Sequence, residues 1–132
     1  MLTELIQHKQ SDDTHIFAFH QATRMAVDDL TQHLRTLYST AKPEHPFYII
    51  LDMRASGMLP LRYLAYSLRA LVSQHPNKPS AYIAVILDDS ALVSVTDALL
   101  KTILRRDHVQ YFTQLDTAQL WLQIERKKAQ RQ

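Results

Sequence analysis

The spacing of apolar and polar residues changes several times along the chain and predicts strands that alternate with helices. From 22 to 41 and from 61 to 72, apolar side chains recur every three or four positions, as they do on one face of a helix. Two other stretches, 47–52 (FYIILD) and 81–87 (AYIAVIL), are almost wholly apolar. Continuous apolar runs of this length are typical of strands in the middle of a sheet covered by helices.

Weaker patterns complete the predicted order of elements. We expect a short strand at 2–6, a polar turn at 7–14 and a strand at 15–20 with both faces partly covered. A helix at 91–106 follows the second buried strand, and we assign its core face to Leu92, Val95, Leu99 and Ile103. After a last strand at 109–112, Asp116 and Gln119 form a capping box for the final helix.

This order predicts an α/β fold, with a mostly parallel sheet of four or five strands and about four helices. The chain has 132 residues, a length that can bury one core, so we expect a single domain over 1–132. Its first part, 1–14, is the N-terminal strand and turn. Its last part, 123–132, is a basic helix end, whose cations Arg126, Lys127, Lys128 and Arg131 face solvent and oppose the helix dipole.

Composition excludes several kinds of site and location. The chain has no cysteine, which removes disulfides and thiolate chemistry, and one glycine, which removes glycine-rich phosphate and dinucleotide loops. Its seven histidines show no metal-binding spacing, so we expect no cofactor. A formal charge of +2 without base-reading groups argues against nucleic acid. A polar N-terminus and the lack of about 18 continuous apolar residues predict no membrane span and a cytoplasmic location.

Four segments resemble the STAS or SpoIIAA-like family of anti-sigma-factor antagonists. They are HIFAF, YIILDM and AYIAVIL, each followed by a helix, and the ending VQYFTQLDTAQLWL; together they span about 15 to 122. The resemblance implies a single SpoIIAA-like domain that is not an enzyme and works by binding a partner protein or, in relatives, a small ligand.

The phosphorylation site of the signalling relatives does not carry over to this chain. The resemblance places their Asp-Ser or Asp-Thr pair at about Pro60 and Leu61, and neither side chain can accept phosphate. Ser56 is the nearest hydroxyl, but it lies several residues too early. Asp52 also resembles the phosphoacceptor of receiver domains, which further need an acidic pair after the first strand and a lysine after the last. Both are missing, so we expect Asp52 to accept backbone N–H bonds in its loop.

Candidate binding residues gather at the predicted carboxyl edge of the sheet, where open α/β sheets bind ligands. Asp52, Arg54 and Ser56 follow one buried strand, and 88–90 follow the next. Asp89 or Ser90 is also a natural cap for the helix that begins there. Gly57 suggests a backbone angle that other residues resist. Met58 and Leu59 either cover the end of the sheet or form an exposed apolar patch.

Two hypotheses follow for this edge. The first is a regulatory domain without a phosphoacceptor, which binds a protein through the 54–61 loop and the exposed side of the 61–72 helix. Its contact residues are Asp52, Arg54, Ser56, Gly57, Met58, Arg62 and Tyr66, with Tyr63 and Arg69 beside them. The alternative is a small-molecule or lipid-binding domain with an apolar pocket lined by Met53, Met58 and Leu59. An edge strand or the exposed helix could also support a homodimer.

Overall fold

The computed structural model describes residues 5–11, 13–42, 45–57 and 59–130, and in them strands and helices alternate as predicted. The strands are β1 (Ile6–Ser11), β2 (Thr14–Phe19), β3 (Phe47–Asp52), β4 (Ala81–Ile86) and β5 (His108–Phe112). The helices are α1 (Arg24–Thr40), α2 (Leu61–Gln74), α3 (Ser90–Ile103) and α4 (Leu115–Gln130).

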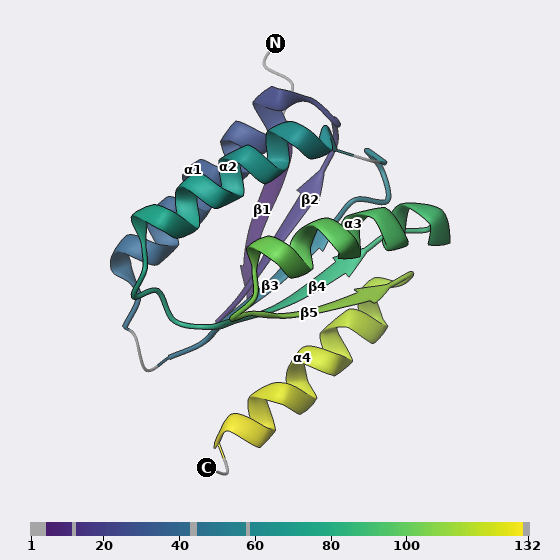
Figure 1. Cartoon of the computed structure of the whole chain (residues 1–132). Helices are drawn as coiled ribbons and strands as arrows, with labels where there is room; N and C mark the ends of the chain where they lie inside the picture. The colour runs from purple at the N-terminus through teal and green to yellow at the C-terminus, as the bar shows by residue number, and fades with distance from the viewer. Residues whose placement is uncertain (1–4, 12, 43–44, 58, 131–132) are drawn as a thin grey trace.

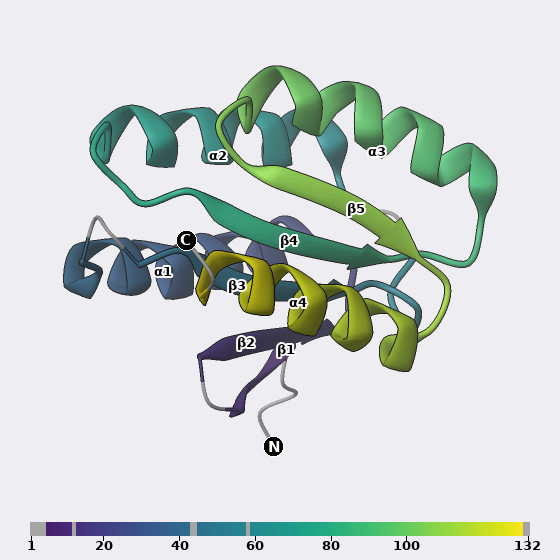
Figure 2. The ribbon, with the colours of Figure 1, turned by 90° about the horizontal axis from the view of Figure 1, so that it is seen from below.

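The strands lie side by side in the order of the chain, β1-β2-β3-β4-β5. β1 and β2 form an antiparallel hairpin, and the other neighbours are parallel, which confirms the mostly parallel α/β sheet. Each helical connection from β2 to β5 leads to the next strand on the same side. When such connections all have the same handedness, their helices lie on the same face of the sheet. Accordingly α1, α2 and α3 cover one face, and α4 crosses the other (Figures 1 and 2).

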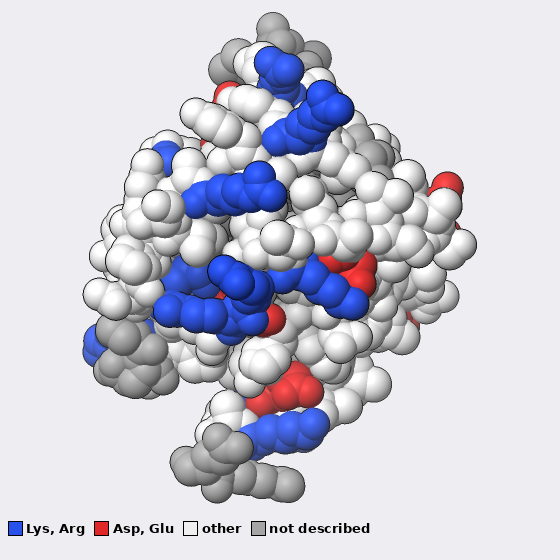
Figure 3. All heavy atoms as spheres, viewed as in Figure 1, with Lys and Arg blue, Asp and Glu red and all other residues white. Residues whose placement is uncertain are grey.

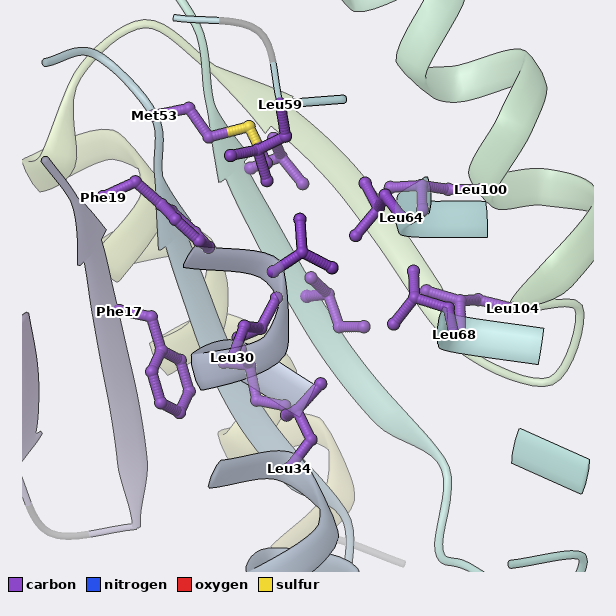
Figure 4. Close-up of a cluster of buried hydrophobic side chains, with 14 of the residues drawn as sticks. Phe17, Phe19, Leu30, Leu34, Met53, Leu59, Leu64, Leu68, Leu100 and Leu104 are labelled. Atoms are coloured by element: carbon purple, nitrogen blue, oxygen red, sulfur yellow. The ribbon is translucent and has the colours of Figure 1, made fainter. Parts of the chain in front are cut away.

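The larger of two apolar clusters lies between the sheet and α1–α3. Phe17 and Phe19 of β2 point into it and are fully buried, with leucines of α1 beside them and leucines of α2 and α3 on the other side of the cluster (Figure 4). The smaller cluster joins β3 and β4 to Ala118 and Leu122 of α4. Because successive strand residues point to opposite faces, Ile49 belongs to the first cluster and its neighbours to the second. The buried strands β3 and β4 are thus packed on both faces, against α1–α3 on one side and α4 on the other.

The N-terminal prediction was wrong in one respect. The segment 7–14 is not a turn, because β1 runs from Ile6 to Ser11 and pairs with β2 from Ile6↔Phe19 to Ser11↔Thr14. After Ile6 every residue of β1 is exposed at the edge of the sheet, which explains why its composition resembles a loop. Of the predicted strand at 2–6, positions 2 to 4 lie outside the described residues.

Two helix predictions also need correction. Of the residues assigned to the core face of α3, Ile103 is buried and Leu92 and Leu99 pack half-buried against the core, but Val95 is 50% exposed. Thr96 and Leu100 are buried in addition. α4 begins at Leu115, so Asp116 lies in its first turn and does not form the predicted capping box. Its carboxylate instead accepts a bond from Thr117 N (2.9 Å).

The basic end of α4 is only partly a solvated surface. Lys127 and Lys128 are exposed as predicted, while Arg131 lies outside the described residues. Arg126 turns back onto the sheet: its guanidinium lies 4.5 Å from the centre of the Tyr48 ring and pairs with Asp13 (2.6 Å). Across the described residues, none of the helices has the length and apolar character needed to cross a membrane.

Candidate functional site

Asp52 and Arg54 form a closed local pair at the carboxyl end of β3. The Asp52 carboxylate accepts bonds from Arg54 N (3.1 Å), Nε (3.0 Å) and Nη2 (2.8 Å). The Arg54 guanidinium lowers the pKa of Asp52 below its ordinary value, and burial opposes this shift in part. The backbone bond is the one predicted for Asp52 in its loop. Since Arg54 occupies both carboxylate oxygens, the pair offers no open carboxylate for a cation.

The loop after this pair depends on the backbone of Gly57. Gly57 has a φ of 74°, as the sequence suggested, and its N–H donates to Met53 O (2.9 Å). A Cβ at this position would meet no atom within 4 Å, so the constraint comes from the backbone angle and not from crowding. Ser56 donates its hydroxyl to Gly57 O (3.0 Å). Met58 lies outside the described residues.

The apolar residues on both sides of the loop belong to the core. Met53 and Leu59 lie close together at one end of the buried cluster (Figure 4), and the Leu59 side chain is only 1% exposed. The cavity beneath them holds about 30 Å³, roughly the space of one water molecule. Drug-sized ligands need pockets of about 300 Å³ or more. This cavity is therefore too small for the ligand of our second hypothesis, and Met58, the third residue predicted to line a pocket here, is not among the described residues.

The outer side of α2 carries the most exposed aromatic ring of the described residues. Tyr66 is 72% exposed, and Arg62 and Arg69 lie one helical turn away on either side of it. Neither arginine has a hydrogen bond or an ion pair to any described residue, and α2 has no acidic residue of its own. We call Arg62, Tyr66 and Arg69 the α2 stripe. Figure 3 shows basic side chains spread down this face of the molecule, with few acidic ones among them.

Tyr63 does not belong to this stripe, although we expected it at the same contact. Its hydroxyl donates to the Asp28 carboxylate on α1, and the guanidinium of Arg24 lies 5.2 Å from the centre of its ring. The hydrogen bond to Asp28 raises the pKa of Tyr63. Tyr63 therefore joins α2 to α1 and is already engaged within the molecule.

The second acidic loop lies beside the first, as predicted. The register pairs Asp52 with Ile86, so β3 and β4 end next to each other. Asp89 is the cap of α3, and its carboxylate accepts from Ala91 N (2.9 Å). The negative charge of Asp88 lies close enough to Arg54 to contribute, after Asp52, to the raised pKa of its guanidinium. The carboxyl edge therefore brings the Asp52–Arg54 pair and Asp88 together, while the α2 stripe lies on the helical layer that follows the loop.

Sequence reasoning missed a cluster of three histidines. His8 Nε2 lies 3.1 Å from His15 Nδ1, the rings of His8 and His33 are 5.0 Å apart, and His8 stacks on Phe17. Burial, and then the neighbouring His33, lower the pKa of His8, and burial lowers the pKa of His15. The three come from β1, β2 and α1. The sequence alone fixes neither the register of the hairpin nor the packing of α1 against it, so it could not reveal the cluster. No group of three ligating side chains among the described residues is arranged to hold a metal.

A buried ion pair at the opposite edge of the sheet was also missed. Lys78 precedes β4 and Asp107 precedes β5, and their side chains are only 3% and 1% exposed. Asp107 Oδ1 accepts from Lys78 Nζ (2.7 Å) and from Ala81 N (2.8 Å). Lys78 Nζ also lies 5.4 Å from the centre of the Tyr38 ring, and burial followed by the Asp107 charge raises the pKa of Tyr38. Nothing in the local sequence around either residue indicates this pairing.

Comparison with known proteins shows the fold. No protein-family model matches the chain, and no curated protein matches its sequence. Among solved structures, it is similar to an uncharacterised DUF3478-family protein with a SpoIIAA-like fold from Shewanella loihica PV-4. The TM-score is 0.63 at 18% identity, over 92% of this chain and 98% of the other.

A second similar structure is the murine anion transporter Slc26a9 in its inward-facing state. The TM-score is 0.52 at 15% identity, over 88% of this chain and 18% of the transporter chain. At these identities the likeness concerns the fold alone. The protein is thus an α/β domain with a SpoIIAA-like fold, as its sequence pattern predicted.

Proposed function

We propose that this protein is a non-enzymatic, STAS-like regulatory domain that binds a partner protein through the α2 stripe and the loop before it. The observation that carries the proposal is Tyr66, an aromatic ring 72% exposed between two arginines that have no acidic partner in the described residues. Tyrosine and arginine are the residue types that concentrate binding energy at protein interfaces.

The charge of the stripe favours a partner with an acidic surface. Arg62 and Arg69 face solvent, and α2 contributes no carboxylate to neutralise them. An acidic partner would be steered toward this face, and each arginine could pair with a carboxylate on docking. The loop supports the stripe because buried Leu59 fixes the start of α2 relative to the sheet.

The proposal includes no phosphorylation switch. Pro60 and Leu61 stand where the resemblance places the phosphoacceptor pair, and neither has a hydroxyl group. Ser56 lies earlier, and its hydroxyl is bonded to Gly57 O within the loop. Binding at the stripe would therefore not depend on phosphate at the position that the resemblance assigns to the phosphoacceptor.

Capture from a lysate of the native host tests the proposal. We would compare wild-type protein with R62E/Y66A and with the control L120A/K127E, which changes an exposed apolar and an exposed basic residue of α4 on the opposite face. Proteins retained by the wild type and the control should be lost with R62E/Y66A, and they should elute as salt screens the arginines.

The melting temperature of each variant checks that the fold is intact, since all four side chains are exposed. If R62E/Y66A retains the same proteins as the wild type, the α2 stripe is not the contact surface.

A further inference from the structure

A cleft of about 600 Å³ opens at the carboxyl edge of the sheet, beyond the ends of β4 and β5. Its volume lies in the range of about 300 to 1,000 Å³ that small-molecule sites occupy. The cleft is separate from the α2 stripe and from the small cavity under the 54–59 loop, with which it shares no lining residue. It is formed between the first turns of α3 and α4.

The topology explains why a cleft forms here. Leu87 N donates to Phe112 O (3.0 Å), so β4 and β5 are held together up to their ends. The chain then turns into α3 on one face of the sheet and into α4 on the other, and the two helices leave the same edge in different layers (Figures 1 and 2). Among the described residues β5 is the edge strand on this side of the sheet, so side chains of this corner remain open to solvent.

The inner part of the cleft is apolar. Leu87 is buried, and Val93, Tyr111 and Phe112 are half-buried around it. The hydroxyl of Tyr111 is buried and has no hydrogen-bond partner of ordinary geometry among the described residues. Burial and the nearby Asp97 carboxylate raise the pKa of Tyr111, so the phenol stays neutral. These surfaces suit the body of an apolar or aromatic ligand.

The outer part of the cleft is polar and acidic. Asp88 lines it together with the hydroxyl residues Ser90, Thr113 and Thr117, and no lysine or arginine is among the lining residues that the structure describes. The carboxylates of Asp89 and Asp116 stand at the starts of α3 and α4, each bonded to a backbone N–H at 2.9 Å. Arg54 is the cation near Asp88, but its guanidinium is held by Asp52. The positive ends of the α3 and α4 dipoles also lie at this corner, but the carboxylates of Asp89 and Asp116 oppose them and Asp88 adds a further negative charge, so the local charge favours a cation.

We propose that this cleft binds a small organic amine with an apolar body. The body packs against Leu87, Val93, Tyr111 and Phe112, and the ammonium group faces the Asp88 carboxylate. Hydroxyls of Ser90 and Thr113 supply acceptors for the remaining N–H groups. Binding is non-covalent, and it does not depend on partner capture at the α2 stripe.

An NMR titration of the full chain with 2-phenylethylamine tests the site, with 2-phenylethanol and phenylacetate as neutral and anionic analogues of similar shape. A fragment of this size should bind with a dissociation constant on the order of 1 mM. Backbone resonances of Val93, Tyr111 and Thr113 should shift with the amine, more weakly with the alcohol and not with phenylacetate.

Substitutions locate the contact. D88N should weaken binding of the amine about two- to fivefold, the range expected for an exposed charge interaction, and leave binding of the alcohol unchanged. The control R62A, on the α2 stripe, should change neither. Melting temperatures confirm that both variants are folded.

Three results would overturn the assignment. They are no saturable shift at the cleft up to about 10 mM amine, equal binding of phenylacetate, and unchanged amine affinity in folded D88N. None of them bears on capture through Arg62 and Tyr66, so the two proposals can fail separately.

Discussion

The two edges of the sheet each carry an ion pair of ideal length, Lys78–Asp107 and Arg54–Asp52, but the two pairs differ in burial and in which parts of the chain they join. Lys78–Asp107 at the amino-terminal edge is almost fully buried, whereas the side chains of Arg54 and Asp52 at the carboxyl edge are 38% and 15% exposed. The first joins segments about thirty residues apart and also holds Ala81 N, while the second joins residues two positions apart.

The difference shows where the fold depends on charge. A buried charge whose partner is removed cannot regain water, so the loss is large. An exposed charge is solvated and screened once its partner is gone, so the loss is small. We therefore expect the ion pair at the amino-terminal edge to contribute far more to stability than the Asp52–Arg54 pair at the carboxyl edge.

The largest effect is expected for D107A. This substitution leaves Lys78 buried without a counter-charge and Ala81 N without an acceptor, and it should lower the free energy of unfolding by about 3–5 kcal/mol. Urea denaturation followed by circular dichroism measures the change.

The double variant K78M/D107N is the matched control for D107A. It removes both charges and keeps an acceptor for Ala81 N, so it should recover much of the lost stability. A loss of less than about 1 kcal/mol in D107A would mean that the buried pair behaves like a surface pair and would remove the contrast between the edges.

An intermediate effect is expected at the carboxyl edge for G57A. The φ of 74° is strained for alanine, and the cost should be about 1–2 kcal/mol. Because a Cβ meets no neighbour there, G57N should cost less, since asparagine tolerates this backbone region. Thermal denaturation compares the two variants. Equal losses would show that the angle is not what Gly57 contributes.

The smallest effect is expected for R54A. Asp52 then loses the two hydrogen bonds from the Arg54 side chain and keeps the one from the backbone N–H at this position. The free energy of unfolding should fall by no more than about 1 kcal/mol. The same urea titration measures it, with K101A, which breaks an exposed pair with Asp97 on α3, as the reference. A loss comparable to that of D107A would place the carboxyl edge among the stabilising regions.

Much of this fold could be predicted because its main elements have strong local patterns. β3 begins and ends where the apolar run does, and α1 and α2 present the expected faces to the core. On α3 only Val95 was placed wrongly, because apolar residues surround that helix and their period does not single out one side. β1 was missed because an exposed edge strand has no apolar alternation to detect.

The candidate site divides in the same way. The position of Asp52, the cap at Asp89 and the exposure of Arg62 and Tyr66 follow from local order along the chain. The histidine cluster, the Lys78–Asp107 pair and the cleft do not, because each depends on side chains brought together by register and crossover. Composition places lysine and aspartate on the surface, and only the packed structure shows that these two are buried.

The sequential strand order has a consequence for how the chain folds during synthesis. Each strand from β2 onward pairs with the one made just before it, so the sheet can grow at one edge as the chain emerges. α4 is the exception, because it packs on β3 and β4 and its Arg126 reaches back to Asp13 and to Thr14, 112 residues earlier. The face of β3 and β4 opposite α1–α3 is therefore covered only after the last helix has been made.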